Sequence, residues 1–162
     1  KSAPDWAVTG TECKRPHNII NSLYLTPNAL EDLVRARYER YKIVEEKEQR
    51  AEEYRTEDAD VIVVAYGASS RVARSAVNKA REAGKKVGLI RPITLWPFPK
   101  DAIKRAADHA KELLVVEMSM GQMVDDVRLA AECRVPVHFY GRTGGVIPTP
   151  KEILGEIDKL LK

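Results

Sequence analysis

Apolar residues from Asp60 onward form four short, continuous runs. The runs lack apolar/polar alternation, which is typical of strands buried on both faces of a parallel sheet. They are Val61–Ala65, Val87–Ile90, Leu113–Glu117 and Val135–Tyr140. Pro136, near the start of the last run, favours an edge strand or a strand that begins there.

The stretches that follow these runs have apolar residues at helical spacing. Their apolar faces consist of Val72, Ala73, Ala76, Val77 and Ala80, then Ala102, Ile103, Ala106 and Ala107, then Met123, Val127, Ala130 and Ala131, and finally Ile153, Leu154, Ile157, Leu160 and Leu161. Gly84 stands where a glycine typically ends a helix, and Thr149–Glu152 has the sequence of a capping box with Pro150 at the first helical position. The order β-α-β-α-β-α-β-α predicts an open, mostly parallel α/β sheet with helices on both faces and right-handed crossovers.

Residues 1–59 have a different pattern. Residues 1–25 show no periodicity and contain Pro4, Gly10 and Pro16, which predicts an irregular arm. Thr26 followed by Pro27 predicts the start of a helix, which we expect to extend to about Tyr54.

The first half of that helix has an apolar stripe, and the second half is nearly all charged. The stripe comprises Leu30, Leu33, Val34, Tyr41 and Val44. A helix of this kind is either a solvated linker or an interface helix, and both interpretations are open. The interface helix would contact a partner through Leu30, Val34, Tyr41 and Val44. We therefore expect two parts: an arm with a linker or interface helix at residues 1–59, and an α/β domain at residues 60–162.

Composition narrows the class of protein but not its function. The chain has 162 residues, 31% of them charged, and a formal net charge of +3, which is too small to indicate a nucleic-acid or membrane partner. Cys13 and Cys133 form no CxxC pair, so neither a zinc site nor an iron–sulfur cluster is expected here, and we expect a reducing, cytoplasmic compartment. His17, His109 and His138 share no metal-ligand spacing.

The sequence was also searched for membrane-spanning and targeting segments. No apolar run is long enough to cross a membrane, and no signal peptide is recognisable. The chain begins with Lys1, and its first residues resemble the middle of a longer protein, so we expect an excised domain or a proteolytic fragment.

In an open α/β sheet, ligands bind beyond the carboxyl ends of the strands. The candidate cofactor-binding residues there are Gly67, Ser69, Ser70, Arg91, Gly144 and Gly145. The first turn lacks the second and third glycines of a dinucleotide fingerprint, and the acid expected about 20 residues further on is absent. We therefore also consider structural roles: turn geometry for Gly67, helix N-capping for Ser69, and reversal of the chain for Gly144 and Gly145.

Arg91 and Glu117 stand at the ends of two predicted strands. We expect them to form an ion pair between neighbouring strand ends, as a structural clamp. The sequence contains no nucleophile elbow, no P-loop and no carboxylate pair assignable to one site. We therefore predict no catalytic residue and no metal ligand, and on these grounds alone a scaffold or partner-binding domain.

Three long stretches resemble one family. They are VAYGASSRVARSAVNKAREAGKKVGLIRPITLWPFP, LLVVEMSMGQMVDDVR and FYGRTGGVIPTPKEI. Together they resemble the alpha-type subunit of 2-oxoacid:ferredoxin oxidoreductases. The upstream segment NIINSLYLTPNALE is similar to that of the 2-ketoisovalerate members, and the resemblance extends from Thr9 to Leu161.

The resemblance implies a transketolase C-terminal-like domain, a three-layer α/β/α sandwich of about five strands with one often antiparallel. Only four strands are recognisable, so a fifth is expected in the first 25 residues or after Gly145. The resemblance also implies oxidative decarboxylation of a 2-oxoacid with coenzyme A and ferredoxin. Thiamine diphosphate, magnesium and iron–sulfur clusters would lie on other domains or subunits. The implied partners are the N-terminal domain of the same subunit, the other subunits, and ferredoxin through the complex.

Three hypotheses follow. The first is the enzyme-complex domain, inactive by itself, whose Gly67–Arg71 turn or Gly141–Gly145 loop could contribute to the coenzyme A or 2-oxoacid entrance. The second is a stand-alone Rossmann-like module that binds a nucleotide or an anion. The third is an oligomerisation domain that uses the long helix, and its self-association would be abolished by charges at Leu30 and Val34.

Overall fold

The computed structural model describes residues 7, 10–17, 19 and 21–161, and the chain divides into two compact units, Lys1–Arg40 and Tyr41–Lys162. The first helix, α1 (Pro27–Lys47), begins in the first unit and ends in the second. The other elements belong to the second unit. They are β1 (Ala51–Tyr54), β2 (Val61–Val64), α2 (Gly67–Glu82), β3 (Val87–Pro92), α3 (Lys100–Ala107), β4 (Glu112–Glu117), α4 (Met123–Ala131), β5 (Val137–Gly141) and α5 (Pro150–Leu160).

The second unit is built on a five-stranded sheet in the order β1-β3-β2-β4-β5. Strands β3, β2, β4 and β5 are parallel, and β1 is antiparallel to β3. All four residues of β2 are buried, as expected for a central strand covered on both faces. The prediction of a mostly parallel α/β sheet is confirmed.

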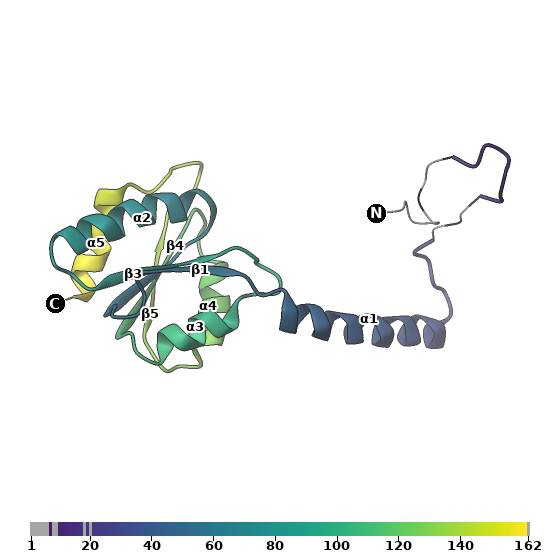
Figure 1. Ribbon diagram of the computed structural model, residues 1–162, viewed down its shortest axis with the longest axis horizontal. Helices are drawn as coiled ribbons and strands as arrows, with labels where there is room; N and C mark the ends of the chain where they lie inside the picture. Colours follow the sequence, from purple (N-terminus) through teal and green to yellow (C-terminus); the bar gives the residue numbers. More distant parts are fainter. Residues whose placement is uncertain (1–6, 8–9, 18, 20, 162) are drawn as a thin grey trace. The chain divides into compact units, whose positions relative to one another are not determined.

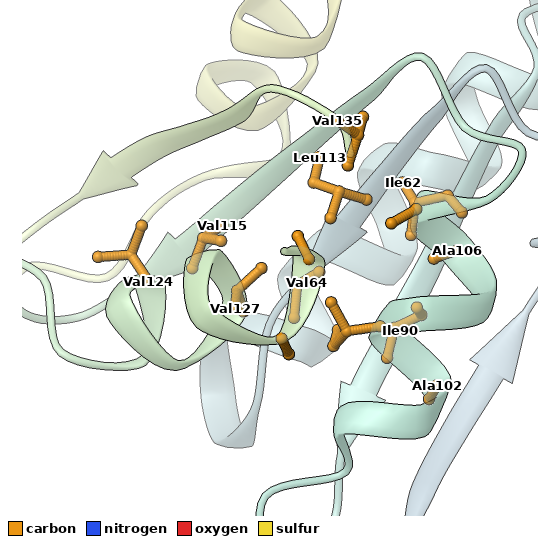
Figure 2. Close-up of a cluster of buried hydrophobic side chains, with 14 of the residues drawn as sticks. Ile62, Val64, Ile90, Ala102, Ala106, Leu113, Val115, Val124, Val127 and Val135 are labelled. Atoms are coloured by element: carbon orange, nitrogen blue, oxygen red, sulfur yellow. The ribbon is translucent and has the colours of Figure 1, made fainter. Parts of the chain in front are cut away.

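Helices cover both faces of this sheet, which gives three layers (Figure 1). Ile62 and Val64 pack with α3 and α4, whereas Val63 and Ala65 pack with α2 and α5. Successive residues from Ile62 to Ala65 therefore alternate between two separate cores, because successive side chains in extended backbone point to opposite faces. Figure 2 shows the first of these cores, where Ile90, Leu113 and Val115 join the two β2 side chains opposite α3 and α4.

The fifth strand is β1, and its position differs from both regions in which we expected it. The predicted helix to Tyr54 is also wrong, since α1 ends at Lys47 and Ala51–Tyr54 pairs with β3. The charged residues at the end of the predicted helix belong to a strand, because their side chains pair with arginines that are distant in the sequence. In the fold, Glu52 pairs with Arg91 and Arg74, and Glu53 pairs with Arg105. Long-range ion pairs thus accommodate an acidic edge strand.

The apolar stripe of α1 contains no buried residue. Leu30 and Val34, in the first unit, are 41% and 37% exposed, and Tyr41, in the second unit, is 37% exposed and packs edge-on against Trp96. The linker and interface interpretations of residues 1–59 therefore both remain predictions. No helix in the described part of the chain is long and apolar enough to cross a membrane.

The predicted capping box at the start of α5 is confirmed. Thr149 Oγ1 accepts a hydrogen bond from the Glu152 N–H, and Glu152 Oε2 accepts from the Thr149 N–H at 2.7 Å and from the Thr149 hydroxyl at 2.8 Å. Pro150 occupies the first turn, and Ile153 and Ile157 are buried against the sheet. The box fixes where α5 begins, and hence which face of α5 packs on β2 and β4.

This cap predicts a specific pH dependence. The hydrogen bonds from the Thr149 backbone N–H and hydroxyl hold the pKa of Glu152 below its ordinary value. A depressed folded pKa means that the contribution to stability is complete above the unfolded pKa and is lost as pH falls through the folded pKa. Thermal unfolding from about pH 5 to about pH 3 should therefore show a shallower fall in Tm for Glu152→Gln than for the wild type.

Two variants of Thr149 control this prediction. Thr149→Ser keeps the hydroxyl and should keep the wild-type pH profile, whereas Thr149→Ala should flatten it partly. An unchanged profile in Glu152→Gln would show that the cap does not titrate as described.

Candidate functional site

Three of the six candidate residues line one hollow at the carboxyl ends of β2 and β3. Gly67, Ser70 and Arg91 share a cavity of about 500 Å³. The remaining lining residues are Tyr66, Ala68, Arg71, Pro92, Ile93 and Leu95. Arg71 belongs to the Gly67–Arg71 turn that the sequence indicated, whereas Leu95, from the loop after β3, was not indicated.

The start of α2 lines part of the hollow. Gly67 has φ +56°, in the left-handed region, and a Cβ there would meet no atom within 4 Å. The Ser70 hydroxyl donates to the Gly67 carbonyl oxygen at 2.7 Å, so its proton is used within the turn. The N-cap residue is Tyr66, and no side chain caps the helix at that position. The N-capping role predicted for Ser69 is therefore wrong: Ser69 is buried inside the first turn of α2.

The ion pair predicted between Arg91 and Glu117 is not formed. Arg91 lies on β3 and Glu117 on β4, and β2 separates these two strands. Instead, Arg91 stands directly opposite Glu52 in the β1–β3 pair, and Arg91 Nη1 lies 3.0 Å from Glu52 Oε2. The sequence could not indicate this partner, because β1 itself was not recognisable.

Glu117 caps a helix instead. Its carboxylate is 1% exposed and accepts hydrogen bonds from the backbone N–H groups of Gln122, Met123 and Val124, at 3.2, 3.1 and 3.0 Å to the nearest oxygen. The Ser119 hydroxyl donates to Glu117 Oε2 at 3.0 Å. The carboxylate thus satisfies the unpaired donors at the start of α4 and lies at the positive end of its dipole. These contacts make Glu117 a structural residue.

Gly144 and Gly145 lie in the loop between β5 and α5 and do not line the hollow. Both have positive φ, +66° and +85°. The Val146 N–H donates to the Thr143 carbonyl oxygen at 3.2 Å and closes a turn around them. Their geometry is that of chain reversal, so the structure does not join them to the other candidates.

A second hollow of about 500 Å³ lies on the other side of the β3–α3 loop, where Trp96, Phe98 and Leu129 provide apolar lining. Lys104 pairs with Glu132 at its rim, with a distance of 2.7 Å between Nζ and Oε1. Asp126 also lines it, and burial, followed by the charges of Asp125 and Glu117, raises the pKa of the Asp126 carboxyl.

The chemistry available in the first hollow is limited. Its titratable lining groups are Tyr66, Arg71 and Arg91, with no carboxylate, histidine or thiol among them. It therefore lacks the imidazole, carboxylate and thiol groups that often serve as general bases. Within the described residues, no group of three or more His, Cys, Asp or Glu side chains could hold a metal ion. Cys13 and Cys133, both exposed and free, fall short of the four thiolates that a cubane cluster needs.

Comparison with protein-family models matches residues 59–153 to pyruvate:ferredoxin oxidoreductase core domain II. A ketoisovalerate oxidoreductase subunit VorB of Methanothermobacter thermautotrophicus is 45% identical over 152 residues, 94% of this chain and 43% of that protein. A 2-oxoglutarate synthase subunit KorA of Methanothermobacter marburgensis is 44% identical over 102 residues, 63% of this chain and 27% of that protein. The chain thus spans less than half the length of these curated relatives.

Solved structures support the fold. A 2-oxoglutarate:ferredoxin oxidoreductase from Magnetococcus marinus, with 2-oxoglutarate, coenzyme A and succinyl-CoA bound, superposes with a TM-score of 0.74. The identity is 24%, and the match covers 86% of this chain and 24% of that one. A split-gene transketolase superposes with a TM-score of 0.57 at 18% identity, covering 69% of this chain and 41% of that one. Both share the layered α/β arrangement.

Proposed function

This chain belongs to the pyruvate:ferredoxin oxidoreductase core domain II family, and we propose that it serves as that domain in a 2-oxoacid:ferredoxin oxidoreductase of the 2-ketoisovalerate type. The observation that carries the proposal is the 45% identity to VorB over 94% of the chain. The identity to KorA is similar but covers only 63% of the chain. The ketoisovalerate assignment is therefore supported by the longer alignment.

In this proposal the chain shapes the assembly and does not catalyse by itself. Thiamine diphosphate, when bound elsewhere in the complex, supplies the carbanion chemistry of 2-oxoacid decarboxylation. The arginine-lined hollow does not fit the magnesium that accompanies this cofactor, because no carboxylate lines it. Coenzyme A, magnesium and iron–sulfur clusters are likewise assigned to the rest of the enzyme.

The proposed partners are the preceding domain of the same subunit type and the other oxidoreductase subunits, with ferredoxin reached through the complex. The two free, exposed thiols suit a reducing compartment, and we place the assembly in the cytoplasm. A nucleotide- or anion-binding module is the second candidate, and it is favoured by a single observation: Arg71 and Arg91 line the same hollow.

Ligand-induced stabilisation separates these two functions. We expect no rise in the Tm of the purified chain with NAD, NADP, inorganic phosphate, or thiamine diphosphate plus magnesium. A ligand that binds only the folded state raises stability by RT ln(1 + [L]/Kd), about 2.7 kcal/mol at a concentration of 100 Kd, so binding would be visible.

Arg71→Ala provides the matched control, because Arg71 is exposed and its replacement should leave the fold intact. A rise in Tm with NAD or NADP that is lost in Arg71→Ala would overturn the scaffold proposal and favour the nucleotide-binding module. A rise with coenzyme A alone would assign part of the acyl-acceptor site to this domain.

A further inference from the structure

The loop between β3 and α3 exposes three large apolar side chains. Ile93, Leu95 and Trp96 are 53%, 49% and 56% exposed. We call these three residues the apolar ridge. The first hollow lies beside Ile93 and Leu95, and the second lies beside Trp96. Monomeric proteins expose such residues singly more often than in clusters, so a cluster in one loop indicates a contact surface.

The ridge is held in place by the rest of the unit. The N–H groups of Ile93 and Thr94 both donate to the Arg50 carbonyl oxygen, at 2.9 and 3.2 Å. In return, the Arg50 N–H donates to Thr94 Oγ1 at 3.0 Å. The Tyr41 ring meets Trp96 edge-on, with 5.1 Å between ring centroids. A surface that is ordered before binding loses little conformational entropy when a partner arrives.

The first hollow, beside Ile93 and Leu95, is lined by positive charge alone, whereas the second hollow, beside Trp96, has charges of both signs. Arg71 and Arg91 line the hollow next to Ile93 and Leu95, and no carboxylate does. Arg91 is already paired with Glu52. Arg71 makes no ion pair with any residue that the structure describes. A partner that covers Ile93 and Leu95 would therefore bury a cation, which is costly unless the partner supplies a carboxylate.

We propose that the apolar ridge and Arg71 form the surface by which this domain docks onto the neighbouring protein of its oxidoreductase assembly. The partner surface is apolar and places a carboxylate opposite Arg71. Tryptophan and arginine are the residue types that most often dominate binding energy at such interfaces. This inference rests on the proposed function, and it adds the site of contact and the chemistry of the partner.

The test uses the affinity-tagged full chain expressed in its source organism. Co-purified 2-oxoacid:ferredoxin oxidoreductase subunits are identified by mass spectrometry and quantified per tagged chain. We expect Leu95→Asp to reduce their amount by about tenfold or more, because it places a charge in the apolar contact. Arg71→Glu should reduce it severalfold, since two carboxylates would then face each other.

Ile147→Asp is the matched control. Ile147 is 54% exposed and lies in the loop after β5, which is three strands from β3, or about 14 Å at the usual strand spacing. Its replacement should leave co-purification unchanged. The Tm values of the purified variants verify that each one folds, and wild-type-like values are expected because every replaced side chain is exposed.

The outcomes separate this inference from the proposed function. If the wild type captures the oxidoreductase subunits and Leu95→Asp captures them equally well, the ridge is not the docking surface, whereas the proposed function stands. If the wild type captures none, the proposed function fails. Ridge-dependent self-association in sedimentation, or ridge-dependent binding to phosphatidylglycerol vesicles, would also overturn the inference in favour of a second copy or a membrane.

Discussion

Replacing Glu117 by alanine should lower the free energy of unfolding by about 3 to 5 kcal/mol. Glu117 is buried, and three backbone N–H groups at the start of α4 donate to it. Without the carboxylate, the N–H groups of Met123 and Val124 stay buried and unpaired, and the Ser119 hydroxyl loses its acceptor as well. Urea unfolding with an unchanged m value measures the loss directly.

A conservative variant and a control variant are compared with Glu117→Ala. Glu117→Gln keeps the shape and the acceptor oxygen but not the charge, so a smaller loss of roughly 1.5 to 3 kcal/mol is expected. Asp125→Asn, in the first turn of the same helix, removes a carboxylate that is 78% exposed and should change stability by about 0.5 kcal/mol or less. A loss in Glu117→Ala no larger than that in Asp125→Asn would contradict the capping role.

Replacing Gly141 by alanine should cost roughly 1 to 3 kcal/mol through a different mechanism. Gly141 ends β5 beside the turn that leads into α4. A Cβ there would lie 2.5 Å from Phe139 Cζ and closer still to the Ser119 carbonyl oxygen. The Arg142 N–H donates to the Glu117 carbonyl oxygen at 3.0 Å, which ties this strand end to the same turn. The backbone must therefore shift to admit a methyl group.

Replacing Gly155 by alanine should have the opposite effect on the free energy of unfolding. It lies within α5, and a Cβ at this position would meet no atom within 4 Å. Gly155→Ala should stabilise the protein by about 0.5 to 1 kcal/mol, because alanine has the higher helix propensity. Equal effects of the two glycine replacements in thermal and urea unfolding would show that close packing at Gly141 is not what selects glycine there.

The sequence indicates those features of the fold that depend on local pattern. The buried runs at Val61–Ala65 and Leu113–Glu117 have no polar interruption, so their place at the centre of a parallel sheet is visible without a structure. The Thr149–Glu152 box is equally local, because both of its partners lie within one turn. The family resemblance rests on long stretches of residues and is confirmed by the family model over residues 59–153.

The missed features depend on partners far apart in sequence. Strand β1 is hidden in a charged run because its acids are matched by Arg74, Arg91 and Arg105, which belong to other elements. Arg91 was assigned to the wrong carboxylate for the same reason. The order of the strands decides which ends are neighbours, and no local pattern encodes that order. The hollow beside Arg71 depends equally on the loop after β3, which folds onto Arg50.

The candidate site is the part that sequence reasoning resolved least. Gly67, Ser70 and Arg91 do meet in one hollow, but Ser69 is buried in α2, and Gly144 and Gly145 lie in another loop. All six residues follow predicted strands. A position after a strand places a residue at the carboxyl edge of the sheet, but it does not show which of these residues line the same cavity. Whether any of them contacts a ligand stays a prediction, to be tested by the ligand panel.

The most direct test of the proposed function is the enzymatic activity of the assembly that co-purifies with this chain. The affinity-tagged chain, purified from its source organism under anaerobic conditions, is supplied with 2-ketoisovalerate, coenzyme A and an oxidised ferredoxin. We expect reduction of ferredoxin that requires both substrates and accompanies the co-purified subunits, whereas the chain separated from them should be inactive. Purification without any oxidoreductase subunit, together with stabilisation of the chain by NAD or NADP, would contradict the proposed function.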